Sequence, residues 1–354
     1  MNTNNKQFTT DDIAKELGLS RSTVSRALNN NQAVKQSTRD RVMEKARELN
    51  FQPNKAARTL VRNKTYTIAV VLFSEPRYFW DNVLQGISKA QQENQCFGIF
   101  VEIFRPPIDH PEEQIKILSE LKKQKIDALA IAPNRISAIE DYLDYFIHKN
   151  IPVLAINIDL PKTKRHLYIG CNYVHAGKVA GELMGKIVRQ GKIGVFSFVE
   201  ETVTTHQRIE GFYSAVRSYE ALHLAPTLYF SRTGVDAVPL TRTFLHSNPD
   251  IQGIFVSFSI LDETAQVLIE EDRTDIVLIG YDLSEETKKH LRSGVIDAVI
   301  CQEPFNQGYY MIQYASDLLL EKISPKEDII NTKIEVVIKE NLCYYSYDSD
   351  DKYI

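Results

Sequence analysis

The spacing of hydrophobic positions changes near residue 65. Before that point, apolar residues recur every three or four positions, which is the period of short amphipathic helices. The pattern predicts helices over about 10–17 and 21–29, with Gly18 in the turn between them, and a third helix that starts at Ser37 or Thr38. Beyond Thr67, short runs of Val, Ile and Leu alternate with helical patterns. We therefore predict a small all-α unit followed by a larger α/β body.

The second predicted helix has an apolar inner face and an outer face made entirely of side chains that form hydrogen bonds. Val24, Ala27 and Leu28 share the inner face, and Ser20 precedes the helix as its expected N-cap. The outward side chains are Arg21, Ser22, Ser25, Arg26 and Asn29. Such a helix suits the major groove of DNA, where arginine pairs with guanine and hydroxyl groups bind phosphates or bases. A small solvated bundle without a DNA partner is the alternative interpretation.

Eight strand-like runs follow in the rest of the chain, and helical patterns separate most of them. They cover 67–73, 96–104, 128–133, 152–157, 192–198, 253–258, 276–282 and 297–302. Continuously apolar strands that alternate with helices predict parallel sheets with both faces covered. Because eight strands exceed one comfortable sheet, we predict two doubly wound subdomains.

The charge of the chain is divided unevenly between these two parts. Residues 1–64 hold 13 Lys and Arg against 6 Asp and Glu, a balance of +7, so the remaining residues carry 29 minus 40, or −11. A basic unit favours a polyanion through the release of counterions, whereas the acidic body should stay off DNA. Double-stranded DNA is therefore the expected macromolecular partner.

Several other functions are not supported by the sequence. No apolar run approaches the ~20 residues of a membrane span, and the N-terminus lacks an apolar signal core, so we expect a cytoplasmic protein with no membrane partner. The four cysteines occur singly, which favours reduced thiols over a metal site. We find no phosphate loop, dinucleotide fingerprint or hydrolase motif, and therefore expect neither an enzyme nor a cofactor.

The run DDIAKELGLSRSTVSRALN, followed by TRDRVMEKARELNFQPNKAARTL, resembles the head of the lactose/galactose repressor (LacI/GalR) family of bacterial transcription regulators. The resemblance implies that Arg21 and Ser22 select the operator. It further implies that Thr23, Ser25, Arg26 and Asn29 contact bases or clamp the DNA backbone. Thr9, Ser20 and Asn54 complete the DNA-binding residues predicted for this part of the chain.

The segment NKAARTLVR, residues 54–62, is too short to form a stable helix alone, since about 12–15 residues are needed. The resemblance implies a hinge helix that folds on DNA, with Asn54 as its N-cap. Ala57 and Leu60 would then enter the minor groove as apolar wedges and kink the duplex. We therefore expect a palindromic operator with a central CG step. A plain interdomain linker is the alternative.

The body is similar to the periplasmic sugar-binding-protein fold that the same regulators carry. The segments that show it are IGCNYVHAGKVAGELMG, RIEGF and GYD. The fold implies three passages of the chain between two subdomains and a ligand cleft at the carboxyl ends of the strands. The expected domains are a helix-turn-helix head (1–53), a hinge (54–65) and a body (66–354). Within the body we expect a first subdomain of 66–158 and 297–322, and a second of 159–296 and 323–345.

The resemblance also implies a set of effector-binding residues. It places Phe79 and Trp80 as stacking residues, and Asn157, Arg208, Asp282 and Gln302 as partners of ligand hydroxyl groups. Core packing is the alternative for the two aromatic residues, an interdomain ion pair for Arg208, and a helix N-cap for Asp282.

Two positions depart from the family pattern. Phe258 and Ser259 stand where relatives usually have Asn-Asp, which adds apolar surface to the predicted cleft. Arg77 and Tyr78 stand where relatives have Asn-Pro before the aromatic pair. Because arginine pairs with carboxylate and phosphate, Arg77 with Arg208 suggests an anionic ligand, such as a uronate or a sugar phosphate. A solvent-facing Arg77 is the alternative.

The expected function is a ligand-responsive transcription regulator, and we expect a repressor of a carbohydrate operon first. A homodimer would bind the palindrome, and a monosaccharide or a derivative in the cleft would release it. A corepressor-dependent regulator or activator that responds to a nucleoside, cyclitol or sugar acid would use the same parts. The C-terminal tail lacks leucine heptads, which favours a dimer over a tetramer. A solute-binding protein and an α/β enzyme are the rival classes.

Overall fold

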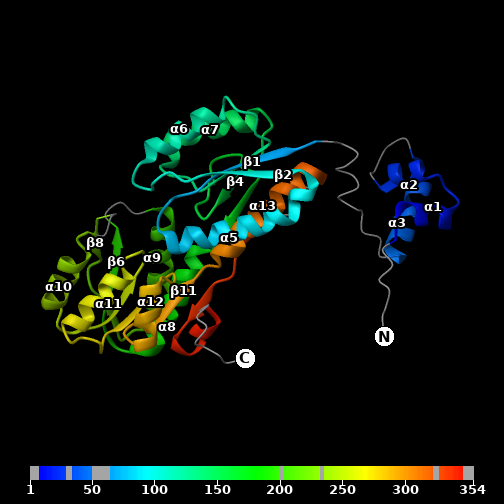
Figure 1. Ribbon diagram of the computed structural model, residues 1–354. Coiled ribbons are helices and arrows are strands. Elements are labelled where there is room, and N and C mark those ends of the chain that lie inside the picture. Colours follow the sequence, from blue (N-terminus) through cyan, green and yellow to red (C-terminus); the bar gives the residue numbers. More distant parts are fainter. Residues whose placement is uncertain are drawn as a thin grey trace. The chain divides into compact units, whose positions relative to one another are not determined.

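The computed structural model describes residues 8–28, 34–49, 64–198, 202–231, 235–321 and 327–345. The chain divides near Tyr66 into a small helical unit and a large α/β unit (Figure 1), and each is described by itself. This confirms the predicted combination of an all-α head and a two-sheet α/β body. Within the described ranges, no helix combines the length and apolar character that a membrane crossing requires.

The head contains α1 (Thr10–Leu17), α2 (Arg21–Leu28) and α3 (Gln36–Glu48). Gly18 ends α1 with φ +61°, the left-handed conformation that glycine adopts without strain. Ile13, Val24, Ala27 and Val42 are almost fully buried, as their spacing predicts. The predicted start of the third helix is wrong: α3 begins at Gln36, and Lys35 before it makes no side-chain cap.

The first lobe of the body is a parallel six-stranded sheet in the order β12-β5-β4-β3-β1-β2. Helices α5 (Arg77–Asn94) and α13 (Pro304–Glu321) cover one face, and α6 (Pro111–Leu121) and α7 (Ile136–His148) cover the other (Figure 1). The strands are β1 Tyr66–Val71, β2 Ile99–Phe104, β3 Ala128–Ile131, β4 Val153–Ile156, β5 Leu167–Gly170 and β12 Ile329–Asn331.

The second lobe has seven strands, with β13-β11-β10-β9-β6-β7 in order and β8 also paired to β6. Helices α8 and α9 cover one face, and α10, α11 and α12 the other. The strands are β6 Gly191–Phe198, β7 Leu222–Leu224, β8 Leu228–Phe230, β9 Ile251–Val256, β10 Val277–Tyr281, β11 Ala298–Cys301 and β13 Glu335–Val337. The helices are α8 Tyr173–Val188, α9 Val203–Val216, α10 Ala237–Ser247, α11 Leu261–Glu270 and α12 Glu285–Ser293. Short 3₁₀ helices, η1 (Gln95–Phe97) and η2 (Lys339–Tyr345), complete the described elements.

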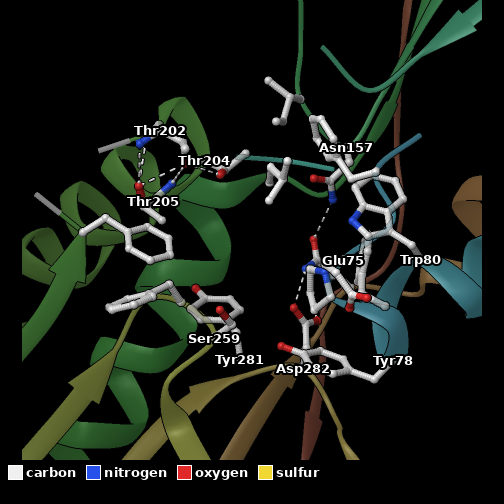
Figure 2. Close-up of a pocket in the computed structure, with 18 of the residues that line it drawn as sticks. Glu75, Tyr78, Trp80, Asn157, Thr202, Thr204, Thr205, Ser259, Tyr281 and Asp282 are labelled. Carbon is white, nitrogen blue, oxygen red and sulfur yellow. Dashed lines mark hydrogen bonds between the residues drawn. The ribbon is translucent and has the colours of Figure 1, made fainter. Parts of the chain in front are cut away.

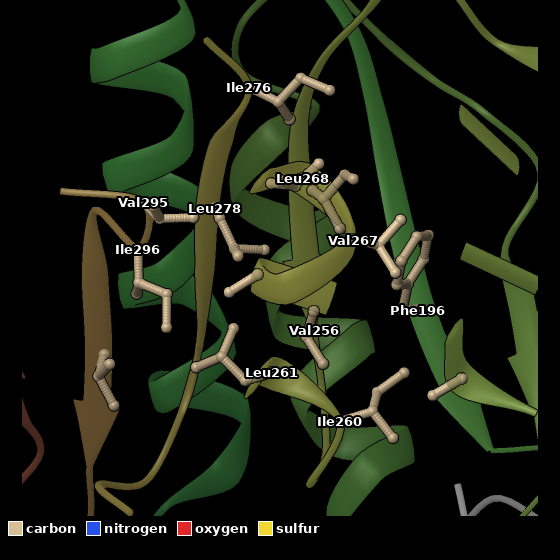
Figure 3. Close-up of a cluster of buried hydrophobic side chains, with 14 of the residues drawn as sticks. Phe196, Val256, Ile260, Leu261, Val267, Leu268, Ile276, Leu278, Val295 and Ile296 are labelled. Carbon is tan, nitrogen blue, oxygen red and sulfur yellow. The ribbon is translucent and has the colours of Figure 1, made fainter. Parts of the chain in front are cut away.

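Each core explains why the inner strands are apolar at nearly every position. The edge strand β2 differs, because Phe100, Glu102 and Ile103 are exposed. In β1, Ile68 and Val70 pack toward α5 and α13, whereas Ala69 and Val71 pack toward α6 and α7. The second lobe repeats this arrangement. Figure 3 shows Val256 and Leu278 from neighbouring strands packed against helix α11. A strand with helices on both faces has no solvent side, so no polar alternation is present in its sequence.

The chain passes between the lobes three times, as the resemblance implies, but at other places than predicted. β5 and β12 belong to the first sheet, and β11 belongs to the second. The predicted boundaries at 158/159, 296/297 and 322/323 are therefore wrong. The passages follow the carboxyl ends of β5, β11 and β12. Each of these strands pairs with a neighbour in its own sheet up to that end, so the chain can cross to the other lobe only after it.

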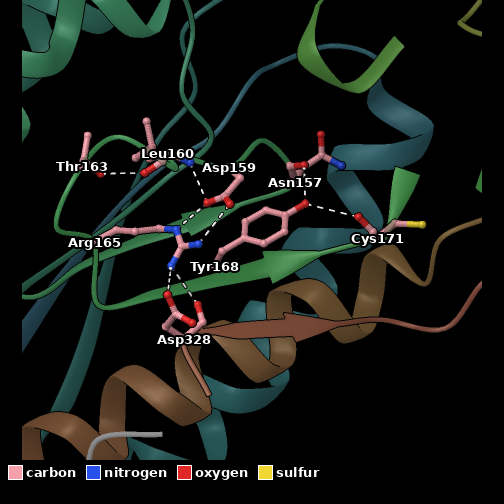
Figure 4. Close-up of polar contacts among 8 residues, drawn as sticks. All are labelled: Asn157, Asp159, Leu160, Thr163, Arg165, Tyr168, Cys171 and Asp328. Atoms are coloured by element: carbon pink, nitrogen blue, oxygen red, sulfur yellow. Dashed lines mark hydrogen bonds and ion pairs between the residues drawn. The ribbon is translucent and has the colours of Figure 1, made fainter. Parts of the chain in front are cut away.

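Arg165 fastens the returning strand β12 to the first lobe. Its guanidinium pairs with Asp159, donates to the backbone carbonyl of Asp328 at 2.8 Å and lies 3.3 Å from the Asp328 carboxylate (Figure 4). Only 6% of the Arg165 side chain is exposed. Ion pairs shielded from water in this way are stronger than exposed ones. Arg165 therefore anchors a strand that reaches this sheet from far along the chain.

Candidate DNA-binding helix and effector cleft

Helix α2 presents the predicted polar face. The Ser20 hydroxyl accepts a hydrogen bond from the Thr23 backbone N–H at 3.1 Å, as an N-cap does. Ser22 and Arg26 are exposed, and 71% of the Arg21 side chain is accessible. Arg21 lies 3.6 Å from Asp11, a pair weak enough to open when DNA competes for the guanidinium.

The other predicted DNA-binding residues have different places. Thr9 caps α1, exchanging hydrogen bonds with Asp12, so it already has a structural role in the free head. The Thr23 hydroxyl lies 2.8 Å from that of Ser20. Ser25 lies within α2. Asn29, Asn54, Ala57 and Leu60 lie outside the described residues, and their roles stay predictions.

A cleft of about 470 Å³ lies between the two lobes of the body (Figure 2). It opens at the carboxyl ends of strands from both sheets, where parallel strands leave polar loop residues together. Most of the predicted effector residues line it: Phe79, Trp80, Asn157, Arg208, Phe258, Asp282 and Gln302. The structure thus brings together side chains that lie more than 200 positions apart in the sequence.

Arg77 is not among the residues that line this cleft, and its predicted role as an effector residue stays a prediction. Its side chain is 76% exposed and lies 3.4 Å from Asp81 on the next turn of α5. At about 100° per residue, Arg77 points some 200° away from Phe79 around the helix axis. The aromatic residue faces inward, and Arg77 consequently faces solvent.

Gln302 lies at the centre of a hydrogen-bonded chain that joins the lobes. Its side-chain carbonyl accepts from the Asn157 amide at 3.4 Å and from the Tyr173 hydroxyl at 3.1 Å. Its amide nitrogen donates to both oxygens of the Asp282 carboxylate, at 3.0 and 2.9 Å. In Figure 2, dashed lines lead from the labelled Asn157 and Asp282 side chains to the side chain between them. These partners fix the orientation of a side chain that is only 2% exposed.

Asp282 follows β10 with φ +63°, a left-handed conformation that is uncommon for a non-glycine residue. The N-cap of α12 is Ser284, so the alternative role of Asp282 as a helix cap is wrong. Burial raises the pKa of Asp282, while Arg208 and Gln302 act in the opposite direction. The remaining lone pairs of the carboxylate suit hydroxyl or amino groups of a ligand.

Arg208 is held within the second lobe. One guanidinium nitrogen donates to the Ser257 carbonyl at 2.9 Å. The guanidinium carbon lies 3.9 Å from the ring centroid of Tyr281 and 5.0 Å from that of Tyr173. These described contacts do not include the interdomain ion pair that was the alternative for this residue. Arg208 is 93% buried, so its flat face forms part of the cleft wall.

The aromatic residues pack in the core and line the cleft at the same time. Trp80 meets Phe73 and Phe79 edge to face, with centroids 5.5 and 4.9 Å away. On the opposite lobe, the Phe258 and Phe198 rings lie 3.8 Å apart. Core packing and ring exposure into the cleft are therefore not exclusive alternatives for Phe79 and Trp80.

Several lining residues were not predicted. Thr202, Thr204 and Thr205 lie together at the start of α9, where Thr202 and Thr205 form a capping box (Figure 2). A threonine three residues before another, ahead of a helical pattern, is a signal that could have located them. Glu75, Tyr78, Asp109 and Tyr281 also line the cleft. Tyr281 belongs to the GYD segment, which could have located it, whereas no sequence signal distinguishes Glu75 and Asp109 from ordinary loop residues.

Family profiles match both parts of the chain. The periplasmic binding protein domain matches residues 68–323, and the profile described as bacterial regulatory proteins, lacI family, matches residues 9–54. The HTH-type transcriptional regulator CelR of Thermobifida fusca is 26% identical over 291 residues, which is 77% of this chain and 82% of that protein. The HTH-type transcriptional regulator MalR of Streptococcus pneumoniae is 25% identical, over 77% of this chain and 83% of its own length.

Solved structures share the fold of the body. The crystal structure of a putative LacI transcriptional regulator from Bacteroides fragilis aligns with a TM-score of 0.74 at 22% identity, over 80% of this chain and 100% of that one. GanP, a glucose-galactose binding protein from Geobacillus stearothermophilus, aligns with a TM-score of 0.72 at 24% identity, over 79% and 99%. With its lacI-type head and its periplasmic binding protein body, the chain belongs to the lacI family of bacterial regulatory proteins.

Proposed function

We propose that this protein is a transcriptional repressor whose hold on a palindromic operator is released by a small sugar-like effector in the cleft. The observation that carries the proposal is the series of hydrogen bonds Asn157–Gln302–Asp282, which crosses between the lobes inside the cleft. The same polypeptide carries helix α2, whose polar face is of the kind that binds DNA. A ligand that forms hydrogen bonds with Asn157, Gln302 and Asp282 contacts both lobes. Such a ligand therefore changes the relative stability of the open and closed arrangements of the lobes.

The two ligands are coupled because each prefers one arrangement of the lobes. In our proposal two chains form a homodimer that presents two copies of α2 to a two-fold symmetric site. The 54–62 segments pair over the minor groove, with Ala57 and Leu60 as wedges and Asn54 as the helix cap. Effector binding separates these segments, and the coupling free energy is typically about 1–3 kcal/mol. We expect the protein to act in the cytoplasm, together with its DNA.

The DNA-binding part of the proposal can be tested by letting the full-length protein select its binding sequence from a pool of random DNA duplexes. The expected product is a palindrome with a central CG step. Arg21→Ala should weaken binding to that palindrome by about tenfold, because one base-contacting arginine contributes roughly 1–3 kcal/mol. Lys116→Ala, an exposed cation on α6, is the matched control and should bind like the parent. Equal binding by Arg21→Ala contradicts the proposed role of α2.

The cleft carries its own reporter, because Trp80 is the only tryptophan of the chain and lines the ligand site. Titration with a panel of monosaccharides should change Trp80 fluorescence for a ligand that also releases the operator. Trp80→Phe should abolish the fluorescence change and retain operator binding. A ligand that changes the fluorescence but tightens operator binding instead favours the corepressor alternative.

The rival classes predict different results. A solute-binding protein without a transcriptional role would bind sugars but select no DNA sequence. An enzyme would convert the bound sugar, so unchanged ligand recovered after prolonged incubation supports our proposal of a non-catalytic regulator. We propose that neither a metal nor another cofactor takes part; among the described residues, no group of three or more His, Cys, Asp or Glu side chains could hold a metal ion.

A further inference from the structure

The charged side chains that line the cleft are mostly acidic. Glu75 and Asp109 line it from loops of the first lobe, and Asp282 lines it from the second. Among the described lining residues, Arg208 is the one basic side chain. This composition is the opposite of what a phosphate or carboxylate ligand requires.

Arg208 supplies one positive charge against these three carboxylates. Its guanidinium donates to the Ser257 carbonyl and lies over the face of Tyr281, and its buried Nε has no hydrogen-bond partner among the described residues. Burial raises the pKa of Asp282, because loss of water disfavours the charged form, and Arg208 and Gln302 oppose this effect only in part. A cationic group on the ligand would supply the missing charge.

Other arginines near the first-lobe rim are held away from the cleft. Arg77 and Arg105 both pair with Asp81, at 3.4 and 2.9 Å. Arg105 also donates to the Ser74 carbonyl at 3.0 Å. Neither of these arginines lines the cleft. The Glu75 carboxylate accepts a hydrogen bond from the Arg77 backbone N–H at 3.0 Å, while both arginine side chains pair with Asp81 rather than with Glu75 or Asp109.

The walls of the cleft suit a cation as well as a sugar ring. Trp80 and Phe79 line one side, and Phe198 and Phe258 line the other. Aromatic faces pack against the C–H surface of a sugar and also attract ammonium groups. The threonine hydroxyls at the start of α9 and the amide of Asn157 provide partners for neutral hydroxyl groups.

We propose that the effector is a polyhydroxylated amine, such as an amino sugar with a free, protonated amino group. The inference rests on the proposed role of the cleft as the effector site. Glu75 and Asp109 on one lobe and Asp282 on the other carry like charges, which oppose closure of the empty cleft. A cation between them removes that repulsion. An amine therefore stabilises the closed arrangement, whereas the neutral sugar of the same shape does so less.

Calorimetric titration of the full chain at about pH 6.5 tests this inference. The probes are glucose, galactose and mannose, each compared with its 2-amino and 2-acetamido derivatives, together with glucuronate and galacturonate. We expect one amino sugar to bind at least about tenfold more tightly than both its parent hexose and its acetylated form. The acetylated sugar keeps the nitrogen and removes the charge, so it separates charge from shape.

Two neutral isosteres locate the effect. Glu75→Gln and Asp109→Asn should each weaken binding of that amino sugar about fivefold more than binding of the parent hexose, in the range of an exposed charge pair. Asp141→Asn, an exposed carboxylate on α7 outside the cleft, is the matched control and should change neither.

The inference is overturned if the tightest ligand is a neutral sugar or a uronate, or if no amino sugar in the panel binds. It is also overturned if Glu75→Gln and Asp109→Asn weaken the amine and the parent hexose equally. These outcomes can be distinguished from failure of the proposed function. A neutral sugar that binds in the cleft and releases the operator contradicts the inference of an amine effector but still supports the proposed repressor function.

Discussion

The side-chain amide of Gln302 donates to both carboxylate oxygens of Asp282, at 3.0 and 2.9 Å. Gln302 stands at the second passage between the lobes, and its backbone carbonyl accepts from the Gln307 amide at 2.9 Å and from the Thr332 hydroxyl at 3.0 Å. Thr332 stands at the third passage. Through its side chain and its backbone carbonyl, this one residue therefore ties the wall of the cleft to two of the connections on which lobe movement depends.

Gln302→Glu should weaken effector binding by about tenfold and lower the free energy of unfolding by roughly 2 kcal/mol, because it places a second carboxylate against Asp282 and removes the donor. Calorimetry and thermal unfolding measure the two effects. Gln124→Glu, which introduces the same charge at an exposed position, is the control and should leave both unchanged. If both variants behave like the parent, Gln302 does not organise the cleft.

Gly18→Ala should destabilise the head by about 1 kcal/mol, because φ is +61° at this position and a Cβ is disfavoured in that conformation. No other atom lies within 4 Å of the added Cβ, so the cost comes from the backbone alone. The Leu19 amide, which donates to Ala14 at 2.9 Å, should exchange hydrogen about fivefold faster. Gly18→Asn tolerates this conformation and should have a smaller effect. A larger loss for Gly18→Asn than for Gly18→Ala would show that the backbone conformation is not the cause.

Gly177→Ala should cost about 3 kcal/mol in the free energy of unfolding, because overpacking forces two elements apart. A Cβ on Gly177 would lie 1.9 Å from the backbone carbonyl oxygen of Arg208, where α8 and α9 are in contact. The displacement also moves Arg208 in the cleft wall, so ligand affinity should fall with stability. Lys178→Ala, on the exposed side of the same helix, is the control for thermal unfolding. A Gly177→Ala protein as stable as this control would show that the helices can separate at little cost.

Asp262→Asn should stabilise the protein near neutral pH. Burial raises the pKa of Asp262 to about 6, against the opposing hydrogen bond from Ser284. Because the folded state holds this proton more tightly than the unfolded chain, the contribution of Asp262 to stability falls as pH rises from about 4 through 6. The variant should therefore be more stable than the parent by about 1 kcal/mol at pH 7.5, after allowance for partial exposure.

The comparison of Asp262→Asn with the parent should be repeated at about pH 4.5. There the advantage of the variant should shrink, since the parent carboxyl is protonated when folded. Chemical denaturation at the two pH values measures the difference. A constant advantage at both would show that the carboxylate charge is not its cause.

Elements with long, uniform patterns were predicted from the sequence. The eight strand-like runs all contain strands, because a strand buried on both faces must be apolar throughout. The short strands β5, β7, β8, β12 and β13 were missed. Each has three or four residues, and β12 and β13 are only partly buried, so their sequences carry little of that signal.

The sheet to which a strand belongs was not predictable in the same way. β5 and β11 are both four-residue strands that are buried throughout, yet they lie in different sheets. Membership depends on which neighbour pairs with the strand, and pairing is a long-range property that local patterns do not record. The wrong subdomain boundaries all follow from this.

Among the effector residues, those that follow a strand were placed in the cleft correctly, because parallel strands end at one edge. Arg77 is not among the lining residues, because its orientation depends on the phase of a helix. Glu75 and Asp109 were missed because acidic loop residues are common on any surface. Their proposed role depends on the cleft, which residues of both lobes line.

The three passages also bear on how the protein is made. Each lobe takes strands from early and late parts of the chain: β12 completes the first sheet and β13 the second. During synthesis, neither lobe can close its sheet until residues beyond about 331 and 337 have left the ribosome. A fragment that ends after α13 would lack an edge strand in both sheets, and premature termination there should yield a protein that proteases remove rather than half a working sensor.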